Sequence, residues 1–242
     1  MSGSDALFFG AHPDDVELTS GGLAALLAAH GHAVTVVDLT AGEAASRGTP
    51  EVRAREAQAA ARELGVDGRE CLGLPDLGLD RSERIQVRAV VECLRRHRPG
   101  LVVAPERDDA HPDHVEAHFL LTRACYLAGL ARFEAAGERF RPARLLFALY
   151  RGRAAPHLVV DVSTVWGKRM RALDRHASQL EGAGGLSTYL NHPDFRAEVE
   201  ARARIFGARI GARHGEGYRS HGPLAIRDAR VLISPAASEA GA

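Results

Sequence analysis

Short, largely apolar runs alternate with helical segments along the first half of the chain. The clearest runs are residues 6–10, 33–38 and 101–104, and a segment with helical spacing of apolar residues comes after each of them. A short run that is apolar on both faces is typical of a strand covered on both sides, as in parallel sheets. The alternation therefore predicts an α/β fold: a Rossmann-like, mostly parallel sheet with helices on both faces.

The remaining elements are expected from the same periodicity and from breaker residues. Gly31, Gly65 and Pro99-Gly100 mark helix ends. The expected helices are 16–30, 50–64, 82–98, 112–130, 165–179 and 195–211. Further strands are expected at 69–72, 144–150 and 158–162, loops at 40–49, 131–143 and 181–192, and a frayed tail at 234–242. Gly21-Gly22 lies inside the first helix and predicts a close approach of another group to the backbone.

Length and composition indicate one domain that spans residues 1–242 and has a substantial core, since 45% of the residues are hydrophobic. Lys+Arg and Asp+Glu both number 31, so zero net charge argues against a general nucleic-acid or anionic-membrane partner. The apolar stretches are too short for a membrane span, and the N-terminus lacks a signal-peptide pattern. Three widely spaced cysteines fit a reducing compartment. We therefore expect a cytoplasmic protein.

Two polar clusters follow two of the apolar runs. Ala11-His12-Pro13-Asp14-Asp15 comes directly after the strand 6–10, and His111-Pro112-Asp113-His114 comes soon after the strand 101–104. In a Rossmann-like order the first and fourth strands are neighbours, and ligands bind at their carboxyl ends. The fold therefore brings together two motifs that lie about a hundred residues apart.

The side chains of these clusters suit a catalytic zinc site. Two imidazoles, from His12 and His114, and one carboxylate are a common zinc-binding set that leaves a position for water. Of the adjacent Asp14 and Asp15, one can bind the metal while the other acts as general base. Zinc lowers the pKa of bound water and polarises a carbonyl. The same set of donors also accepts iron or cobalt.

Two further residues of the second cluster complete the predicted site. Attack on an amide needs an acid or a cation beside the developing oxyanion, and His111 is the candidate. Asp113 lies two residues further on, where its carboxylate can hold the His111 ring in one tautomer. The site predicted from the residues thus supports hydrolysis of an amide.

Each of these patterns has other interpretations. A single His-Pro-Asp-Asp can be a helix N-cap, and His192-Pro193-Asp194 is interpreted as such a cap. His118, four residues after His114, leaves a helical two-histidine ligand pair open. A nucleotide-binding dehydrogenase is disfavoured, because the first turn lacks GxGxxG. A metal-binding scaffold without catalysis also stays open.

The chain resembles the zinc-dependent sugar N-deacetylases of the PIG-L/LmbE family, and within it the bacillithiol-biosynthesis branch. The two clusters and Gly21-Gly22 carry the family likeness. The likeness to the branch extends over nearly the whole chain and rests on Asp38–Glu43, Gly48–Pro50, Arg53, Glu56-Ala57, Leu74–Asp76, Gly78-Leu79, Val160–Ser163, Ser178-Gln179 and Gly215–Tyr218.

That resemblance implies removal of the acetyl group from N-acetylglucosaminyl malate, by a homo-oligomer that is often a hexamer. It also implies a role for each matching residue. The implied roles are metal ligand for His12, Asp15 and His114, general base for Asp14, oxyanion stabiliser for His111, its orienting partner for Asp113, and substrate contact for Arg53.

Two positions depart from the pattern of the branch. Ala110 stands where a basic residue is usual, and His176 replaces a tyrosine. Both departures concern how the malate end of the substrate is held. Arg107, Arg151 and Arg153 are basic residues that can compensate for them. The alternative is the same amide hydrolysis on a different acylated amino sugar or thiol conjugate.

Overall fold

A seven-stranded sheet forms the centre of the molecule in the computed structural model, which describes residues 3–151, 154–181 and 187–226. The strands have the order β3-β2-β1-β4-β5-β7-β6. The bounds are β1 Ala6–Gly10, β2 Val34–Thr40, β3 Gly68–Leu74, β4 Leu101–Pro105, β5 Arg144–Ala148, β6 Leu158–Asp161 and β7 Gly215–Ser220. Strands β1 to β5 are parallel, and β7 runs antiparallel between β5 and β6.

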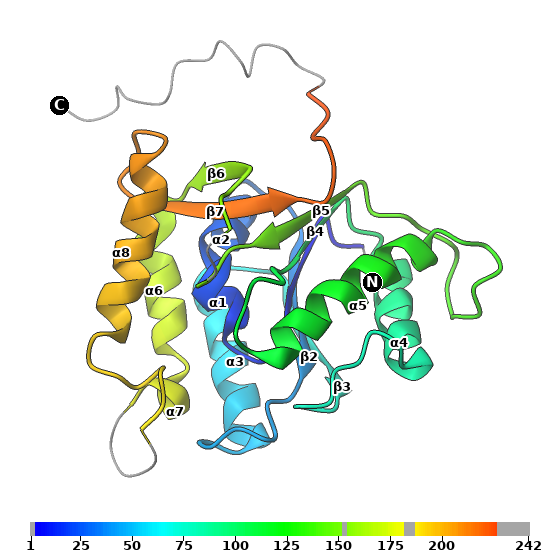
Figure 1. Ribbon diagram of the computed structural model, residues 1–242, viewed down its shortest axis with the longest axis horizontal. Helices are drawn as coiled ribbons and strands as arrows, with labels where there is room; N and C mark the ends of the chain where they lie inside the picture. The colour runs from blue at the N-terminus through cyan, green and yellow to red at the C-terminus, as the bar shows by residue number, and fades with distance from the viewer. Residues whose placement is uncertain (1–2, 152–153, 182–186, 227–242) are drawn as a thin grey trace.

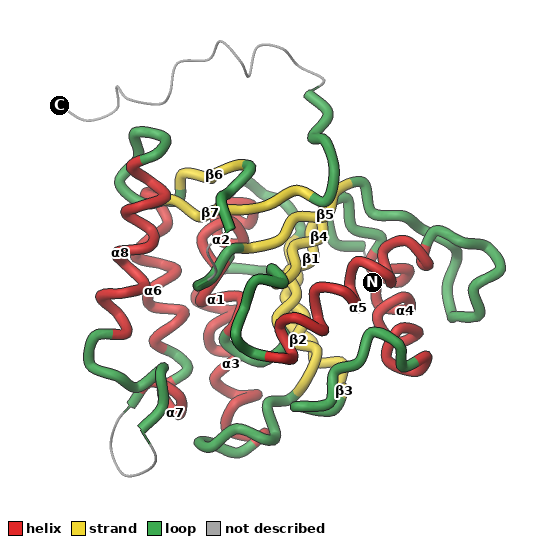
Figure 2. Tube along the Cα trace, viewed as in Figure 1, coloured by secondary structure: helices red, strands yellow, loops and turns green. Residues whose placement is uncertain are grey.

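Helices cover both faces of this sheet, as the alternation predicted (Figures 1 and 2). One face packs on α4 and α5, and the other on α2 and α3. Helix α6 packs on α2 and α3, and α8 packs on β6 and β7. The helices are α1 Asp15–Thr19, α2 Gly21–Ala29, α3 Pro50–Leu64, α4 Arg84–His97, α5 Pro112–Ala128, α6 Trp166–Asp174, α7 Ala177–Leu180 and α8 Phe195–Ala208, with a 3₁₀ turn at Ser163–Val165. None of the helices described is long and apolar enough to cross a membrane.

The predicted helix 50–64 is confirmed at both ends. Thr49 begins it, because its side chain accepts a hydrogen bond from the backbone N–H of Val52 and Pro50 follows at the first helical position. Gly65 ends it in the left-handed conformation, at φ 76°, which glycine adopts without a Cβ penalty. Both signals are local, so the sequence sufficed to place this helix.

The predicted helix 16–30 is wrong as one continuous helix. It is divided into α1 and α2 at Ser20. The carboxylate of Glu216 in β7 accepts hydrogen bonds of 2.8 Å from the backbone N–H groups of Gly22 and Leu23. A Cβ at Gly22 would lie 2.7 Å from Glu216 Oε1, so the predicted close approach at the glycine pair is confirmed. Because β7 was not predicted, its carboxylate could not be placed here.

The C-terminal elements agree only in part. The expected helix 165–179 is divided into α6 and α7, and the expected helix 195–211 ends at Ala208. Strands β5 and β6 lie within the expected ranges 144–150 and 158–162. The tail 234–242 is outside the described residues.

Candidate metal centre and active site

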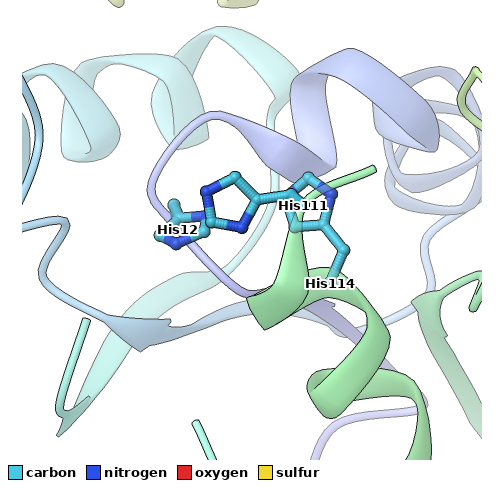
Figure 3. Close-up of side chains that lie close together, drawn as sticks. All are labelled: His12, His111 and His114. Carbon is cyan, nitrogen blue, oxygen red and sulfur yellow. The ribbon is translucent and has the colours of Figure 1, made fainter. Parts of the chain in front are cut away.

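The two polar clusters meet at the carboxyl ends of β1 and β4. These strands pair in parallel, with Ala6 opposite Leu101 and Phe8 opposite Val103. The loop after β1 carries His12, and the start of α5 carries His111 and His114, so that the three rings gather at one place (Figure 3). The ring centroids lie 4.7 to 5.5 Å apart. The predicted convergence of the two motifs is therefore confirmed.

The carboxylate of Asp15 lies between two of these histidines. Its Oδ2 is 3.6 Å from Nδ1 of His12, and its Oδ1 is 3.1 Å from Nε2 of His114. All three side chains are at most 13% exposed. Two imidazole nitrogens thus face one carboxylate, which is the donor set that a zinc-type metal prefers.

The opposite nitrogen of each of these rings also faces a carboxylate. Nε2 of His12 lies 3.1 Å from Oδ1 of Asp76 and 3.3 Å from Oδ2 of Asp113, and Nδ1 of His114 lies 3.1 Å from Oδ2 of Asp109. Metal-binding histidines commonly have such a carboxylate partner on the outer nitrogen, which fixes the tautomer and the ring orientation. The residues present therefore fit a divalent metal.

The electrostatics of the cluster favour positive charge at its centre. Burial opposes protonation of His12, but hydrogen bonds to Asp113, Asp15 and Asp76 raise its pKa to about 12. Burial likewise opposes the charged form of Asp15, yet His114 and His12 hold its pKa well below the ordinary value. Carboxylates that stabilise imidazolium rings also stabilise a bound cation.

Three compact groups of possible metal donors occur among the described residues, and only one of them lies outside this site. His12, His111 and His114 form one compact group and His12, Asp76 and Asp113 another, both within the site above. Glu70, Cys93 and His97 form a third, away from it. There the guanidinium of Arg96 already lies 2.7 Å from Glu70, and burial raises the pKa of the Cys93 thiol, so the group is an ion-pair cluster.

Asp14 is buried beside the site in a strained backbone conformation. Its φ is 127°, which residues with a Cβ rarely adopt, and such strain is typical of functional positions. The Arg53 guanidinium lies 3.3 Å from the Asp14 carboxylate and donates to the carbonyls of Pro13 and Gly42. Burial raises the pKa of Asp14 to about 6, against the attraction of Arg53. A carboxyl group with such a pKa suits a general base near neutral pH.

His111 and Asp113 interact differently from the prediction. The backbone N–H of Asp113 donates to Nδ1 of His111 at 3.3 Å. The Asp113 carboxylate instead faces His12 and accepts hydrogen bonds from the backbone N–H groups of Leu77, at 2.7 Å, and Leu79. Among the described residues, it is thus the main chain of Asp113, and not its carboxylate, that hydrogen-bonds to the His111 ring. Since Nδ1 accepts, the proton of a neutral His111 ring is on Nε2.

The site opens into a cavity of about 1040 Å³. Its lining includes six of the seven predicted site residues, together with Ala110, the loop residues 44–47, Tyr150, Arg151 and Tyr189. The predicted residues in the lining are His12, Asp14, Asp15, Arg53, His111 and His114. Such a volume accommodates a drug-sized ligand.

The residues invoked for the malate end have different positions. Arg151 lines the cavity, with its guanidinium 3.7 Å from the centre of the Tyr189 ring. Arg107 is exposed, and Arg153 is outside the described residues. His176 is fully buried, with Nε2 3.2 Å from Oε2 of Glu17. Of those that the structure describes, Arg151 is the one that lines the cavity.

The other histidine patterns have structural roles. His118 stacks on Phe147 at 4.0 Å between ring centroids, and its Nδ1 is 3.1 Å from the carbonyl oxygen of Pro105. Burial lowers its pKa to about 4, so it is a neutral packing residue rather than half of a ligand pair. Asp194 stands at the N-cap position of α8, as the capping interpretation predicts, and its backbone N–H donates to Nδ1 of His192, but its side chain makes no capping hydrogen bond.

Sequence reasoning did not assign Asp76 or Asp109. Asp76 belongs to the motif Leu74-Pro75-Asp76, which was noted only for its resemblance, and Asp109 precedes the second cluster by two residues. Both side chains are at most 10% exposed. An acidic residue two positions before a histidine motif is the signal that could have indicated Asp109, whereas no histidine lies near Asp76 in the sequence.

Comparisons with known proteins agree with this architecture. Residues 7–125 match the family model PIG-L, described as GlcNAc-PI de-N-acetylase. A 1D-myo-inositol 2-acetamido-2-deoxy-alpha-D-glucopyranoside deacetylase from Rhodococcus opacus is 29% identical over 182 residues, which are 62% of each chain. The chain thus spans about three fifths of the length of that relative.

Solved structures extend the likeness to nearly the whole chain. The conserved protein TT1542 from Thermus thermophilus matches with a TM-score of 0.85 and 36% identity, over 92% of this chain and 97% of that one. The 4-carboxy-2-hydroxymuconate hydratase GalB from Pseudomonas putida has a TM-score of 0.76 at 23% identity, over 94% and 99%. The second likeness concerns the fold alone.

Fold and site together define a class: a Rossmann-like α/β protein with a candidate cation site, made of His12, Asp15 and His114, at the carboxyl ends of two neighbouring strands. The family model that matches residues 7–125 narrows this class to one protein family. The chain belongs to the PIG-L family.

Proposed function

We propose that this chain is a metal-dependent N-deacetylase that hydrolyses the acetamide of an N-acetylglucosamine conjugate. The observation that carries the proposal is the Asp15 carboxylate between Nδ1 of His12 and Nε2 of His114, with Asp14 and His111 beside it in one cavity. Family membership and the names of the relatives support the same reaction. Zinc is the proposed metal, since imidazole and carboxylate donors suit it, and iron is the alternative.

The proposed mechanism assigns His12, Asp15 and His114 to hold the metal. When bound, the metal supplies Lewis acidity that activates water and polarises an amide carbonyl. Asp14 takes the proton from the attacking water, and its raised pKa suits a general base near neutral pH. The neutral His111 ring donates a hydrogen bond from Nε2 towards the developing oxyanion, and Asp14 passes the proton it has taken from water to the leaving amine, which restores its carboxylate. Asp113 fixes the His111 ring through its main chain.

The role of Arg53 has two components in this proposal. Its guanidinium holds Asp14 and the carbonyls of Pro13 and Gly42, and the residue also lines the cavity. The first set of contacts supports Arg53 as a residue that positions the base. Contact with the sugar, which the resemblance implies, remains part of the proposal.

The proposal also names the group that is attached to the N-acetylglucosamine, which we infer to be malate. The resemblance to the bacillithiol branch favours malate, whereas the deacetylase of Rhodococcus opacus is named for an inositol conjugate. Arg151 on the cavity wall favours an anionic group such as malate, since a guanidinium pairs with carboxylates. A homo-oligomer, hexameric by resemblance, is likewise proposed and is tested by light scattering after size exclusion.

The test is release of a primary amine by the purified, zinc-loaded protein. N-acetylglucosaminyl malate, N-acetylglucosaminyl inositol and free N-acetylglucosamine are compared at equal concentrations. We expect amine from at least one conjugate, loss of activity with a chelator and its return on adding zinc. Absence of amine from all three would overturn the proposal. Faster release from the inositol conjugate than from the malate conjugate would overturn only the choice of malate.

A further inference from the structure

Asp76 joins two parts of the site that are separate in the sequence. Its Oδ1 lies 3.1 Å from Nε2 of His12, on the side of the ring away from Asp15. Its Oδ2 accepts a 2.8 Å hydrogen bond from the backbone N–H of Ala44. Its own backbone N–H donates to Oε1 of Glu43 at 2.8 Å. One carboxylate thus contacts both a proposed metal ligand and the loop between β2 and α3.

That loop forms part of the cavity wall and is held at its other end as well. Residues 44–47 line the cavity. Arg47 donates to the carbonyl oxygens of Ser178, at 3.1 Å, and Glu181, and the side chain of Gln179 donates to the carbonyl of Arg47 at 2.8 Å. The loop therefore lies between Asp76 on one side and α7 on the other.

Asp109 provides a comparison within the same site. Its carboxylate lies 3.1 Å from Nδ1 of His114, as that of Asp76 does from Nε2 of His12. It also accepts a hydrogen bond from the backbone N–H of His111, within its own loop. Asp109 and Asp76 thus support equivalent histidines, but Asp76 has the additional contact with the cavity loop.

We propose that Asp76 is a positioning residue that couples the cavity loop to the metal centre through its two carboxylate oxygens. When a metal holds the His12 ring, the Asp76 carboxylate that contacts this ring is held as well. The backbone N–H of Ala44 then donates to a carboxylate oxygen that no longer moves. The loop is then ordered by metal binding although it supplies no ligand. Because coupling between two sites is reciprocal, a ligand that orders the loop also tightens metal binding.

This inference rests on the metal centre in the proposed function, and its test needs no substrate. Zinc alone is the probe, and amide hydrogen exchange of the peptide covering residues 41–49 is the readout, beside zinc affinity from competition with a chromogenic chelator. In the unaltered protein we expect zinc to slow exchange in this peptide. Asp76→Asn should bind zinc about 10–100-fold more weakly, as for other carboxylates behind ligand histidines, and lose the slowing even at saturating zinc.

Asp109→Asn is the matched control. It should weaken zinc by a similar factor but keep the zinc-dependent slowing in residues 41–49. Ala44→Pro is a second variant, which removes the N–H and leaves the carboxylate on His12. It should lose the slowing and weaken zinc binding only by the coupling that it removes, less than Asp76→Asn does. It therefore keeps the test valid if Asp76→Asn does not fold.

The outcomes separate this inference from the proposed function. Failure of the unaltered protein to bind zinc would overturn the metal centre itself. Zinc binding with equal slowing in Asp76→Asn and the unaltered protein would overturn the coupling alone. A loss of zinc affinity far greater in Asp76→Asn than in Asp109→Asn would make Asp76 a ligand and also overturn its positioning role.

Discussion

Oε1 of Glu216 in β7 accepts a hydrogen bond of 2.8 Å from the backbone N–H of Gly22, at the start of α2. The same carboxylate lies 3.1 Å from Nε of Arg169 and accepts a hydrogen bond from the hydroxyl of Tyr218. Arg169 in turn donates to the carbonyls of Glu17 and Leu18 at the end of α1. A late strand thus fixes the helix pair that follows the first metal-site motif.

This contact predicts opposite results for two adjacent glycines. In Gly22→Ala the new Cβ would lie 2.7 Å from Glu216 Oε1 and 2.8 Å from Val162 Cγ1, so we expect a loss of about 1–3 kcal/mol in the free energy of unfolding. In Gly21→Ala the nearest atoms are 3.4 Å away, and alanine favours a helix, so we expect no loss or a gain of up to about 1 kcal/mol. Urea unfolding measures both. Equal effects at the two positions would contradict the assigned role of Glu216.

The variant Asp14→Asn separates catalysis from metal binding. The amide cannot accept the proton, so we expect kcat to fall by about 10²–10⁴-fold. The proposed ligands His12, Asp15 and His114 are unchanged, so zinc content by elemental analysis should stay at the level of the unaltered protein. His12→Ala, in contrast, should lose zinc. Full activity of Asp14→Asn would exclude it as the general base.

A buried ion pair beneath the site predicts a large stability effect. Arg69 donates to Glu17 at 2.7 Å and holds both oxygens of Asp38, and all three side chains are at most 4% exposed. In Arg69→Met these two carboxylates lose their guanidinium, so we expect a loss of about 3–5 kcal/mol in the free energy of unfolding. Arg171→Met is the control, because its pair with Glu63 is exposed on the arginine side, and it should cost no more than about 1 kcal/mol. A comparable loss in both variants would be inconsistent with burial as the cause.

Stability below neutral pH should depend on Glu70. A hydrogen bond with His97, assisted by Cys93 and Arg96, lowers the pKa of Glu70 from 4.5 to about 2. A carboxyl group whose pKa is lower in the folded state adds stability above its unfolded pKa, and this contribution is lost as pH falls from about 4.5 towards 2. The difference in unfolding free energy between the unaltered protein and Glu70→Gln should therefore be largest near neutral pH and shrink through this range.

The control for this pH dependence is Glu134→Gln. Glu134 pairs with Arg84 at 2.7 Å, but its side chain is 83% exposed, so solvent screens the pair and its removal should change stability by less than about 1 kcal/mol at any pH. Chemical denaturation at several pH values measures both variants. A Glu70→Gln difference that grows as the pH falls would refute the assigned contribution.

The sequence by itself determined the parallel part of the sheet and the meeting of the two polar clusters. Apolar runs and local stop signals such as Gly65 depend on neighbours in the chain, so the parallel strands and α3 followed from the pattern. Parallel order then required His12 and His114 to meet, because β1 and β4 end at the same edge of the sheet.

Only the tertiary structure decided the contacts made between distant segments. The break at Ser20 lies beside the hydrogen bonds from Gly22 and Leu23 to Glu216, almost two hundred residues away. The Gly21-Gly22 pair indicated a close approach at this point but not which group makes it. The Asp113 carboxylate faces His12 rather than His111, because the amides of Leu77 and Leu79 hold it there. Asp76 likewise gained its position from the fold. Sequence patterns thus determined which groups reach the site, and packing decided which atom each one contacts.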